Sequence, residues 1–521
     1  MCIRESSRRE FVAQCCRIAS TGFVTSTLVG TSRAMTSERI DERTILAASA
    51  TSVADFLRRR RISVTDLVDI AIGQIKKVNP SLNAVIHFPE ELARQQAKQI
   101  DTLLDNDAVN WELTPLMGVP ITIKDCLNVA DMPTTSGVPI WKDTKAKSDA
   151  TVVKRLRDAG AILIGKTNLP ALMSAYETGT SEFGVTNNPY DLSHTPGGSS
   201  GGEAAIIASG GSWLGIGTDG LGSIRVPAHY CGVPGLRPGW GRVSRAGQVP
   251  AVPHAEGWLP DPGYTVTGPF ARSVADLHLA LSIMQGPDPR DTKTFPVPLG
   301  DYRKVELHGM KVAYWTQGSG AVLTPETERT LEDARRTLEE RGVRVVDAKP
   351  PLADEIYDIS QALYSPFFLD SWKQTLKEHG IDQLGPIDCD MMRGLSAWAT
   401  PYSKSQVEQF QLRLPELRTG LLSFLREYDA ILSPVTATPA PKHATTFTDI
   451  RRLIFVQLPA YLPAIPSGSV PCGFSDRTDK SQPLPIGVQV IARQFREDVV
   501  LAFMKALEDD LGGWQPPPIL T

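Results

Sequence analysis

The spacing of apolar residues along the chain predicts helices and strands in alternation. In residues 53–78 apolar side chains recur three and four positions apart, which predicts two amphipathic helices that end before the Asn-Pro pair at positions 79 and 80. Residues 118–124 alternate with a period of two and predict a strand. Further helical or extended patterns follow at 151–159, 161–164, 203–209, 213–217, 310–315, 324–340, 343–347, 423–434 and 486–491. This alternation favours an α/β fold built on a layered sheet.

The strand predicted at residues 118–124 places different kinds of side chain on its two faces. Val119, Ile121 and Ile123 share one face, whereas Thr122 and Lys124 share the other, because successive strand residues point in opposite directions. An isolated lysine at the end of a strand is most often solvated, so this pattern alone gives Lys124 no function.

The composition narrows the classes of protein to which the chain can belong. The 521 residues are 41% hydrophobic and carry a formal net charge of -4, which is typical of a globular protein and gives no electrostatic sign of nucleic-acid binding. The seven cysteines form no CxxC pair and no Cys/His group at metal-ligand spacing. Neither a disulfide framework nor a structural zinc site is therefore expected.

Residues 1–36 have the character of a separate segment. Residues 7–12, SRREFV, have the twin-arginine form, and a weakly apolar, uncharged stretch follows at 18–32. That stretch is short and rich in Ser and Thr, so no membrane span is predicted. Two interpretations stay open: a twin-arginine export signal, which implies a periplasmic protein, or a translation start at Met35, which implies a cytoplasmic one.

Residues 195–211, TPGGSSGGEAAIIASGG, allow three interpretations: a flexible linker, a phosphate cradle or the elbow of a serine nucleophile. Just downstream, residues 215–220 fit the GxGxxG pattern of dinucleotide sites. Such a site needs an acidic residue about twenty positions further on. No Asp or Glu occurs between Asp219 and Glu256, so the dinucleotide interpretation is rejected.

The linker and the elbow also lack support. An elbow at Ser200 would need a preceding strand, but residues 187–191 form turns, and His229 and His254 are bases outside any triad context. A linker is disfavoured because a second Gly/Ser cluster, GTDGLGSIRVP, follows a predicted helix and strand. Two such clusters indicate a built site in which backbone N–H groups approach a ligand closely.

The stretch GGSSGGEAAIIASGGSWLGIGTDGLGSIRVPAHYCGVPGLRP, residues 197–238, closely resembles the long signature of the amidase signature family of serine hydrolases. Matching segments, among them GVPITIKD and AGAILIGKTNLP, extend the resemblance over residues 53–510. It implies one domain over 53–510, with a mixed central β-sheet between helical layers. Glu203 is more similar to the acetamidase and fatty-acid-amide-hydrolase branch, with its bacterial amidases, than to the tRNA amidotransferase branch.

The resemblance also implies a Ser-Ser-Lys triad, with Ser223 as the nucleophile, Ser199 as the bridging serine with a cis peptide, and Lys124 as the base. A lysine can accept a proton only when its amine is neutral, and burial among Gly-rich loops would depress its pKa. Asp125 would oppose this by favouring the charged form, but it should point to the opposite face of the strand. Lys166 is a rival buried base that has no triad role in the family, so a structural role is expected for it.

Supporting roles follow from the same resemblance. Ser200 should hold the bridging serine or the leaving group, and Asp219 with Arg225 should form an ion pair beside the nucleophile, since a buried charge needs a partner.

The oxyanion hole is expected from the backbone N–H groups of Gly220, Leu221, Gly222 and Ser223. The family usually has Asp-Ile-Gly-Gly-Ser where this chain has Asp-Gly-Leu-Gly-Ser. A positive φ at Leu221 would cost on the order of 1 to 3 kcal/mol.

The expected reaction is hydrolysis of a small-molecule carboxamide through an acyl-enzyme, with no metal or organic cofactor. Aromatic residues at 357–402 are compatible with a pocket for a bulky or aromatic acyl group, although plain helix core is the more frequent explanation for such spacing; they are Phe367, Phe368, Trp372 and Trp398, with Met391 and Met392. Two further functions stay open: a carbamate or ester hydrolase on the same scaffold, and an A-type subunit of a tRNA-dependent amidotransferase. A homodimer is left open.

Overall fold

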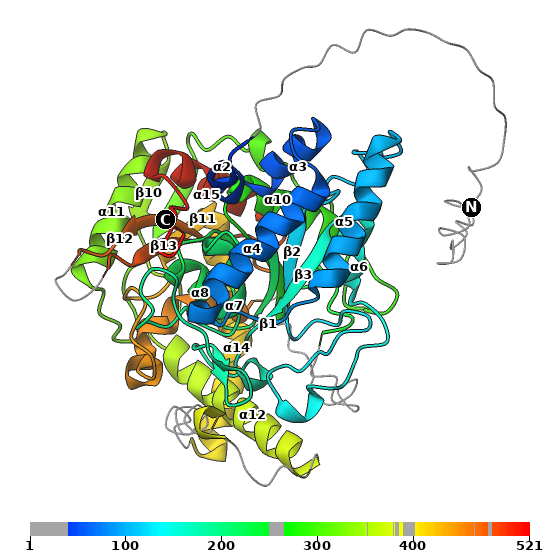
Figure 1. Cartoon of the computed structure of the whole chain (residues 1–521). Helices are drawn as coiled ribbons and strands as arrows, with labels where there is room; N and C mark the ends of the chain where they lie inside the picture. The colour runs from blue at the N-terminus through cyan, green and yellow to red at the C-terminus, as the bar shows by residue number, and fades with distance from the viewer. Residues whose placement is uncertain are drawn as a thin grey trace, which may run out of the picture. The chain divides into compact units, whose positions relative to one another are not determined.

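The computed structural model describes residues 40–248, 265–351, 353–378, 380, 385–388, 402–462, 464–477 and 482–520. Within them, the chain from Ile40 onward forms one compact unit built on a large central sheet (Figure 1).

The main sheet has eleven strands in the order β1-β3-β2-β6-β8-β7-β12-β13-β11-β9-β10. Strands β2, β3 and β6 run parallel, as do β9, β10 and β11, whereas β6–β8, β7–β12, β12–β13 and β11–β13 are antiparallel. The strands are β1 (Val85–His87), β2 (Pro120–Lys124), β3 (Ile162–Thr167), β6 (Leu214–Asp219), β7 (Gly235–Arg237), β8 (Val266–Ala271), β9 (Lys311–Tyr314), β10 (Arg344–Asp347), β11 (Ala430–Pro434), β12 (Ser467–Phe474) and β13 (Pro485–Ala492); β4 (Gly179–Thr180) and β5 (Gly184–Val185) form a separate hairpin. The sheet is mixed, as the sequence led us to expect.

Helices cover the sheet (Figure 1). Helix α7 packs on β2, β6 and β8, helix α15 on β12 and β13, and helix α11 on β10 and β13, while α12 and α14 pack on each other. The helices are α2 (Glu42–Ala47), α3 (Ala50–Arg58), α4 (Val64–Leu82), α5 (Glu90–Asp105), α6 (Thr151–Asp158), α7 (Gly201–Ala208), α8 (Arg225–Tyr230), α10 (Val274–Met284), α11 (Pro325–Glu340), α12 (Ile356–Glu378), α14 (Lys404–Glu427) and α15 (Glu497–Leu511). None of the helices in the described part is both long and apolar enough to cross a membrane.

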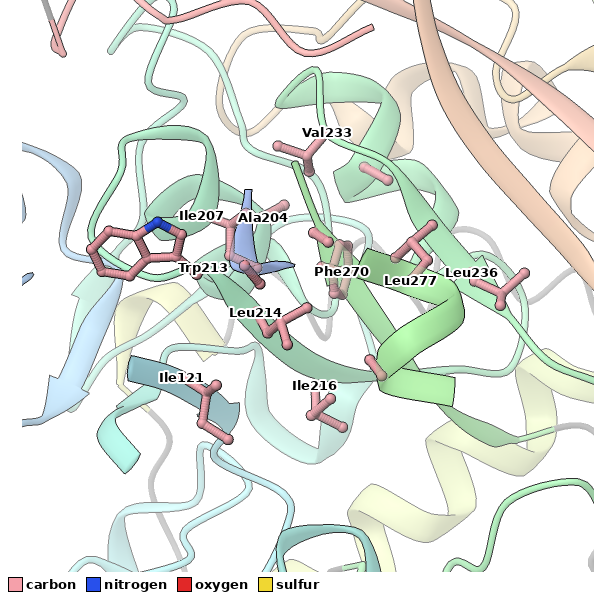
Figure 2. Packing of buried hydrophobic residues seen from close by; sticks show 14 of the residues in the cluster. Ile121, Ala204, Ile207, Trp213, Leu214, Ile216, Val233, Leu236, Phe270 and Leu277 are labelled. Carbon is pink, nitrogen blue, oxygen red and sulfur yellow. The ribbon is translucent and has the colours of Figure 1, made fainter. Parts of the chain in front are cut away.

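The core closest to the Gly-rich segment lies between α7 and the middle of the sheet. Figure 2 shows Phe270 of β8 on the same side of the sheet as Ala204 and Ile207 of α7, whereas Ile121 of β2 and Ile216 of β6 lie on the opposite side. All of these side chains are buried. Helix α7 is buried along its whole length, which explains why its residues other than Glu203 are small or apolar on every side of the helix.

The glycines of the GxGxxG pattern make room for this helix. A Cβ at Gly215 would lie 1.9 Å from Glu203 Oε2, and a Cβ at Gly217 would lie 2.8 Å from Ser200 Oγ. These glycines therefore bring β6 close to α7, which is a packing role and not nucleotide binding.

One predicted boundary was wrong. Helix α4 runs on through Pro80 to Leu82, whereas the Asn-Pro pair was expected to end it. Pro80 falls in the last turn, and Asn83 closes the helix in the left-handed conformation with its N–H on the carbonyl oxygen of Asn79 at 2.7 Å. The Asn79 side chain then accepts from the N–H groups of Ala84 and Val85, so the end of the helix is held beyond the proline.

Candidate active site

Lys124 ends β2 and points into a set of hydroxyl groups. Its Nζ lies 2.7 Å from Ser199 Oγ, 2.8 Å from Ser200 Oγ and 3.0 Å from Thr218 Oγ1. The side chain is 0% exposed, and burial lowers the pKa of Lys124 to about 8. At pH 7 roughly a tenth of the lysine is then free amine, which is the form that a general base requires.

Asp125 turns away from Lys124, as strand alternation predicts. Its Oδ1 lies 2.6 Å from Lys166 Nζ, and its Oδ2 accepts from the N–H of Thr135 at 3.0 Å. Lys166 also donates to Thr134 Oγ1 at 2.7 Å. Both charged side chains are fully buried, so each neutralises the other on the opposite side of the strand from the hydroxyl cluster.

The segment before α7 brings two serines to the lysine. The peptide bond between Gly198 and Ser199 is cis. A side chain at Gly198 would be blocked, because a Cβ there would lie 2.6 Å from the carbonyl oxygens of Ala175 and Glu177. The N–H of Ser200 donates to the carbonyl oxygen of Ser223 at 3.2 Å, which joins this segment to the turn that follows β6.

The turn after β6 is organised around the Asp219 carboxylate. Oδ1 accepts from the N–H of Gly222 at 2.8 Å, and Oδ2 accepts from the N–H of Ile224 at 3.1 Å and of Arg225 at 3.3 Å. These three amides flank Ser223 on both sides. The carboxylate therefore fixes the backbone on which the Ser223 hydroxyl sits.

The charge of Asp219 is compensated within the core. The Arg225 guanidinium donates to both carboxylate oxygens, at 2.9 and 3.0 Å, and Arg237 lies 3.6 Å away. Burial alone would raise the pKa of Asp219, but the two arginines and the backbone N–H groups lower it to about 2. The expected Asp219–Arg225 ion pair is thus present beside Ser223.

Leu221 causes no backbone strain in this turn. The positive φ falls on Gly222, at 126°, and not on Leu221. Tyr176 Oη donates to the Leu221 carbonyl oxygen at 3.1 Å, and the leucine side chain is buried. The cost of a positive φ at Leu221 therefore does not arise in this conformation.

Of the four amides expected to form an oxyanion hole, Gly222 already donates to Asp219. Within the described residues, the N–H groups of Gly220, Leu221 and Ser223 have no acceptor. Gly220 and Ser223 are also partly exposed, whereas Lys124, Ser199 and Ser200 are buried. The site therefore opens to solvent at Ser223 and is closed at the lysine.

Among the described residues, His229 is not available as a rival base. His229 is buried, its Nδ1 accepts from the N–H of Gly487 at 2.6 Å, and its Nε2 lies 3.1 Å from the carbonyl oxygen of Thr438. Both ring nitrogens are occupied by the backbone, and burial lowers the pKa of His229 to about 4. His254 lies outside the described residues.

Other sequence predictions also fall outside the described part of the chain. They are the twin-arginine segment at residues 1–36, the side chains of Phe367, Phe368 and Trp372, and the residues Met391, Met392 and Trp398. Two contacts of the site were not predicted: Thr218 as a third partner of Lys124, and Glu203 on Thr122 and Thr167. The sequence singled out Glu203 only as a mark of one family branch, and its place opposite Gly215, Thr122 and Thr167 depends on the folded sheet.

A separate depression of about 790 Å³ lies at the end of β9 and the start of α11. Its cationic side chains already have partners, since Arg329 pairs with Asp476 at 2.8 Å and Lys349 pairs with Asp354. It shares no lining residue with the Lys124 cluster.

The chain combines a buried amine, a cluster of serine hydroxyls and a mixed sheet covered by helices, and comparison with known proteins places this combination in a known family. The model of the family described as Amidase matches residues 66–501, so the chain belongs to the amidase signature family and is an amidase. The crystal structure of a bacterial aryl acylamidase of this family superposes with a TM-score of 0.75 at 27% identity, covering 89% of this chain and 96% of that one.

Two curated relatives represent different branches. Human fatty-acid amide hydrolase 2 is 30% identical over 502 residues, covering 91% of each chain. The A-type subunit of the glutamyl-tRNA(Gln) amidotransferase of Geobacillus thermodenitrificans is 30% identical over 492 residues, covering 89% of this chain and 97% of the relative. Overall identity is the same for both, so it does not separate the two branches.

Proposed function

We propose that the chain hydrolyses a small-molecule carboxylic amide through an acyl-enzyme on Ser223. The observation that carries this proposal is the buried Lys124 amine at hydrogen-bond distance from Ser199, whose neighbour Ser200 is bonded to the backbone of Ser223. We infer the order Lys124 as base, Ser199 as relay hydroxyl and Ser223 as nucleophile, supported by the burial of Lys124 and Ser199 and the partial exposure of Ser223.

In this mechanism Ser223 Oγ attacks the carbonyl carbon while its proton passes to Ser199 Oγ. The Ser199 proton passes in turn to the free amine of Lys124, which becomes an ammonium. The same path in reverse delivers the proton to the leaving nitrogen, because an amine leaves readily only when protonated. Water then releases the acid by the same base-assisted route and restores Ser223.

The developing oxyanion needs donors that are not already occupied. We propose the N–H groups of Gly220, Leu221 and Ser223 for this role and assign Gly222 to holding the turn through Asp219. Ser200 supports the site, since its Oγ accepts from Lys124 and lies 3.3 Å from the Thr218 carbonyl oxygen. No step of the mechanism requires a metal or an organic cofactor.

A carbamate or ester hydrolase is the second candidate, because the acyl-transfer steps are common to all three substrate classes. A component of a tRNA-dependent amidotransferase is the third, favoured by relatives such as the Geobacillus protein. We retain amide hydrolysis as the first candidate because human fatty-acid amide hydrolase 2 is equally similar and the family is one of amidases. A homodimer and export through residues 1–36 remain part of the proposal.

A substrate panel tests the assignment. The purified protein is assayed against aryl, alkyl and amino-acid amides, matched carbamates and esters, and glutamine, beside a Ser223→Ala variant whose fold is checked by circular dichroism. We expect turnover of at least one amide and a loss of at least about a thousandfold in the variant, because the nucleophile has no substitute. Activity on glutamine only within a larger complex would favour the amidotransferase, and unchanged rates in Ser223→Ala would remove Ser223 from the mechanism.

A further inference from the structure

Glu203 is a buried carboxyl that the proposed reaction does not use. It lies in the first turn of α7 and is 0% exposed. Its Oε2 accepts from Thr122 Oγ1 at 2.7 Å, and its Oε1 accepts from Thr167 Oγ1 at 2.8 Å. Thr122 lies two residues before Lys124 on the same face of β2. The carboxyl and the Lys124 side chain therefore lie on the same face of β2, the face that α7 covers.

The absence of a side chain at Gly215 leaves the space that the Glu203 carboxyl occupies. A side chain at Gly215, on the neighbouring strand β6, would place its Cβ 1.9 Å from Glu203 Oε2. Only glycine at this position lets β6 and the carboxyl occupy the same region. The Glu203 carboxyl thus accepts two hydrogen bonds from threonines and fits only because position 215 has no side chain. The fold is specific for a carboxyl at this place.

Few charges are available to balance Glu203. The positive charge of Lys124 acts on Glu203 and lowers its pKa. Cys126, Asp219 and Glu203 in turn act on Lys124 and raise its pKa, against the larger effect of burial. Burial raises the pKa of Glu203 to about 8, a shift that the two threonine hydroxyls and Lys124 oppose.

The other nearby cations are committed elsewhere. Lys166, next to Thr167 on β3, is paired with Asp125 on the other face of the sheet. Arg272 lies at the far end of α7, where it donates to the carbonyl oxygens of Ile207 and Ser212. Of the described cations, Lys124 is therefore the one that acts on Glu203, whereas Lys124 itself is influenced more strongly by burial, Cys126 and Asp219 than by Glu203.

We propose that Glu203 is a positioning residue that adjusts the proton affinity of Lys124. An ionised carboxyl at 203 stabilises the Lys124 ammonium, whereas a protonated carboxyl releases the lysine as the free amine. The two groups then titrate as a coupled pair rather than as independent sites. This inference rests on the proposed function, in which the free amine of Lys124 is the base.

The test compares Glu203→Gln with the wild-type protein. Glutamine retains the shape and can hydrogen-bond both threonines, but it cannot ionise. Removing the negative charge should lower the proton affinity of Lys124, so we expect the rising limb of kcat/KM against pH to move down by roughly half to one pH unit. Glu508→Gln is the matched control: this half-buried carboxyl caps α10 through the N–H of Val274, and its removal should leave the limb in place.

A direct measurement separates this inference from the mechanism. The ε-carbon resonance of Lys124, in protein labelled with ¹³C-lysine and assigned by its loss in Lys124→Ala, reports the lysine titration whether or not Lys124 acts in catalysis. We expect its midpoint to fall in Glu203→Gln, and an unchanged midpoint would overturn the proposal. A limb that persists in Lys124→Ala would instead refute the base assignment.

A second variant keeps the proposal testable if Glu203→Gln does not fold. Thr167→Val removes one hydroxyl that stabilises the carboxylate, so the carboxyl stays protonated to higher pH. The Lys124 midpoint should move in the same direction by a smaller amount. A merely structural role for Glu203 would lower activity or stability in either variant without moving the midpoint.

Discussion

The pH dependence of amide hydrolysis follows directly from the burial of Lys124. With a pKa of about 8, and before any coupling to Glu203 is counted, roughly 1% of the lysine is free amine at pH 6 and roughly 90% at pH 9. If the free amine is the base, kcat/KM should rise roughly ninetyfold between these values and then level off. The assay is a steady-state profile with an amide whose own groups do not titrate over this range.

Two variants test which lysine causes the increase of kcat/KM with pH, the rising limb of the profile. Lys124→Ala should abolish it. The matched control removes the other fully buried lysine together with its partner, as Asp125→Asn with Lys166→Gln, so that no unpaired charge is left in the core. This control should retain the limb even if its rate is lower. A limb that is lost in the control and retained in Lys124→Ala would make Lys166 the base and refute the reasoning.

The remaining predictions concern the nucleophile turn and metal independence. Asp219→Asn weakens the hydrogen bonds to Gly222, Ile224 and Arg225 and leaves the arginine uncompensated, so it should lower the free energy of unfolding by about 3 to 5 kcal/mol, measured by thermal or denaturant unfolding. Its kcat should fall by at least about tenfold at temperatures where the variant stays folded, and a fully active, fully stable variant would show that the carboxylate does not organise the turn. Incubation with EDTA should leave activity unchanged, because no step of the mechanism uses a metal; loss on chelation with recovery on adding zinc would contradict this.

The sequence predicted the local parts of this site well. The period-two pattern around Lys124 placed Thr122 and Lys124 on one face and Asp125 on the other, and the structure confirms both. Short-range alternation is sufficient here because a strand imposes it directly. The segment at 423–434 was less well defined, since it contains the end of α14 and the whole of β11.

Contacts between distant segments were not predictable in the same way. The pairing of β6 with the antiparallel strand β8, and of β12 with β13, depends on the order of strands in the finished sheet. The place of Glu203 beside Thr122 and Thr167 depends on how α7 packs over β2 and β3. Tertiary packing of this kind leaves little trace in local periodicity, so a single sequence predicts the residues of the site better than their partners.

The central claim is that Lys124 carries a proton from Ser223 to the leaving group, and a comparison of two substrates tests it most directly. An amide nitrogen must be protonated to leave, whereas an alcohol of low pKa leaves with little help. For an amide and an activated ester of the same acid, Lys124→Ala should reduce kcat/KM for the amide by at least about a hundredfold more than for the ester. Equal slowing of both substrates would contradict the account.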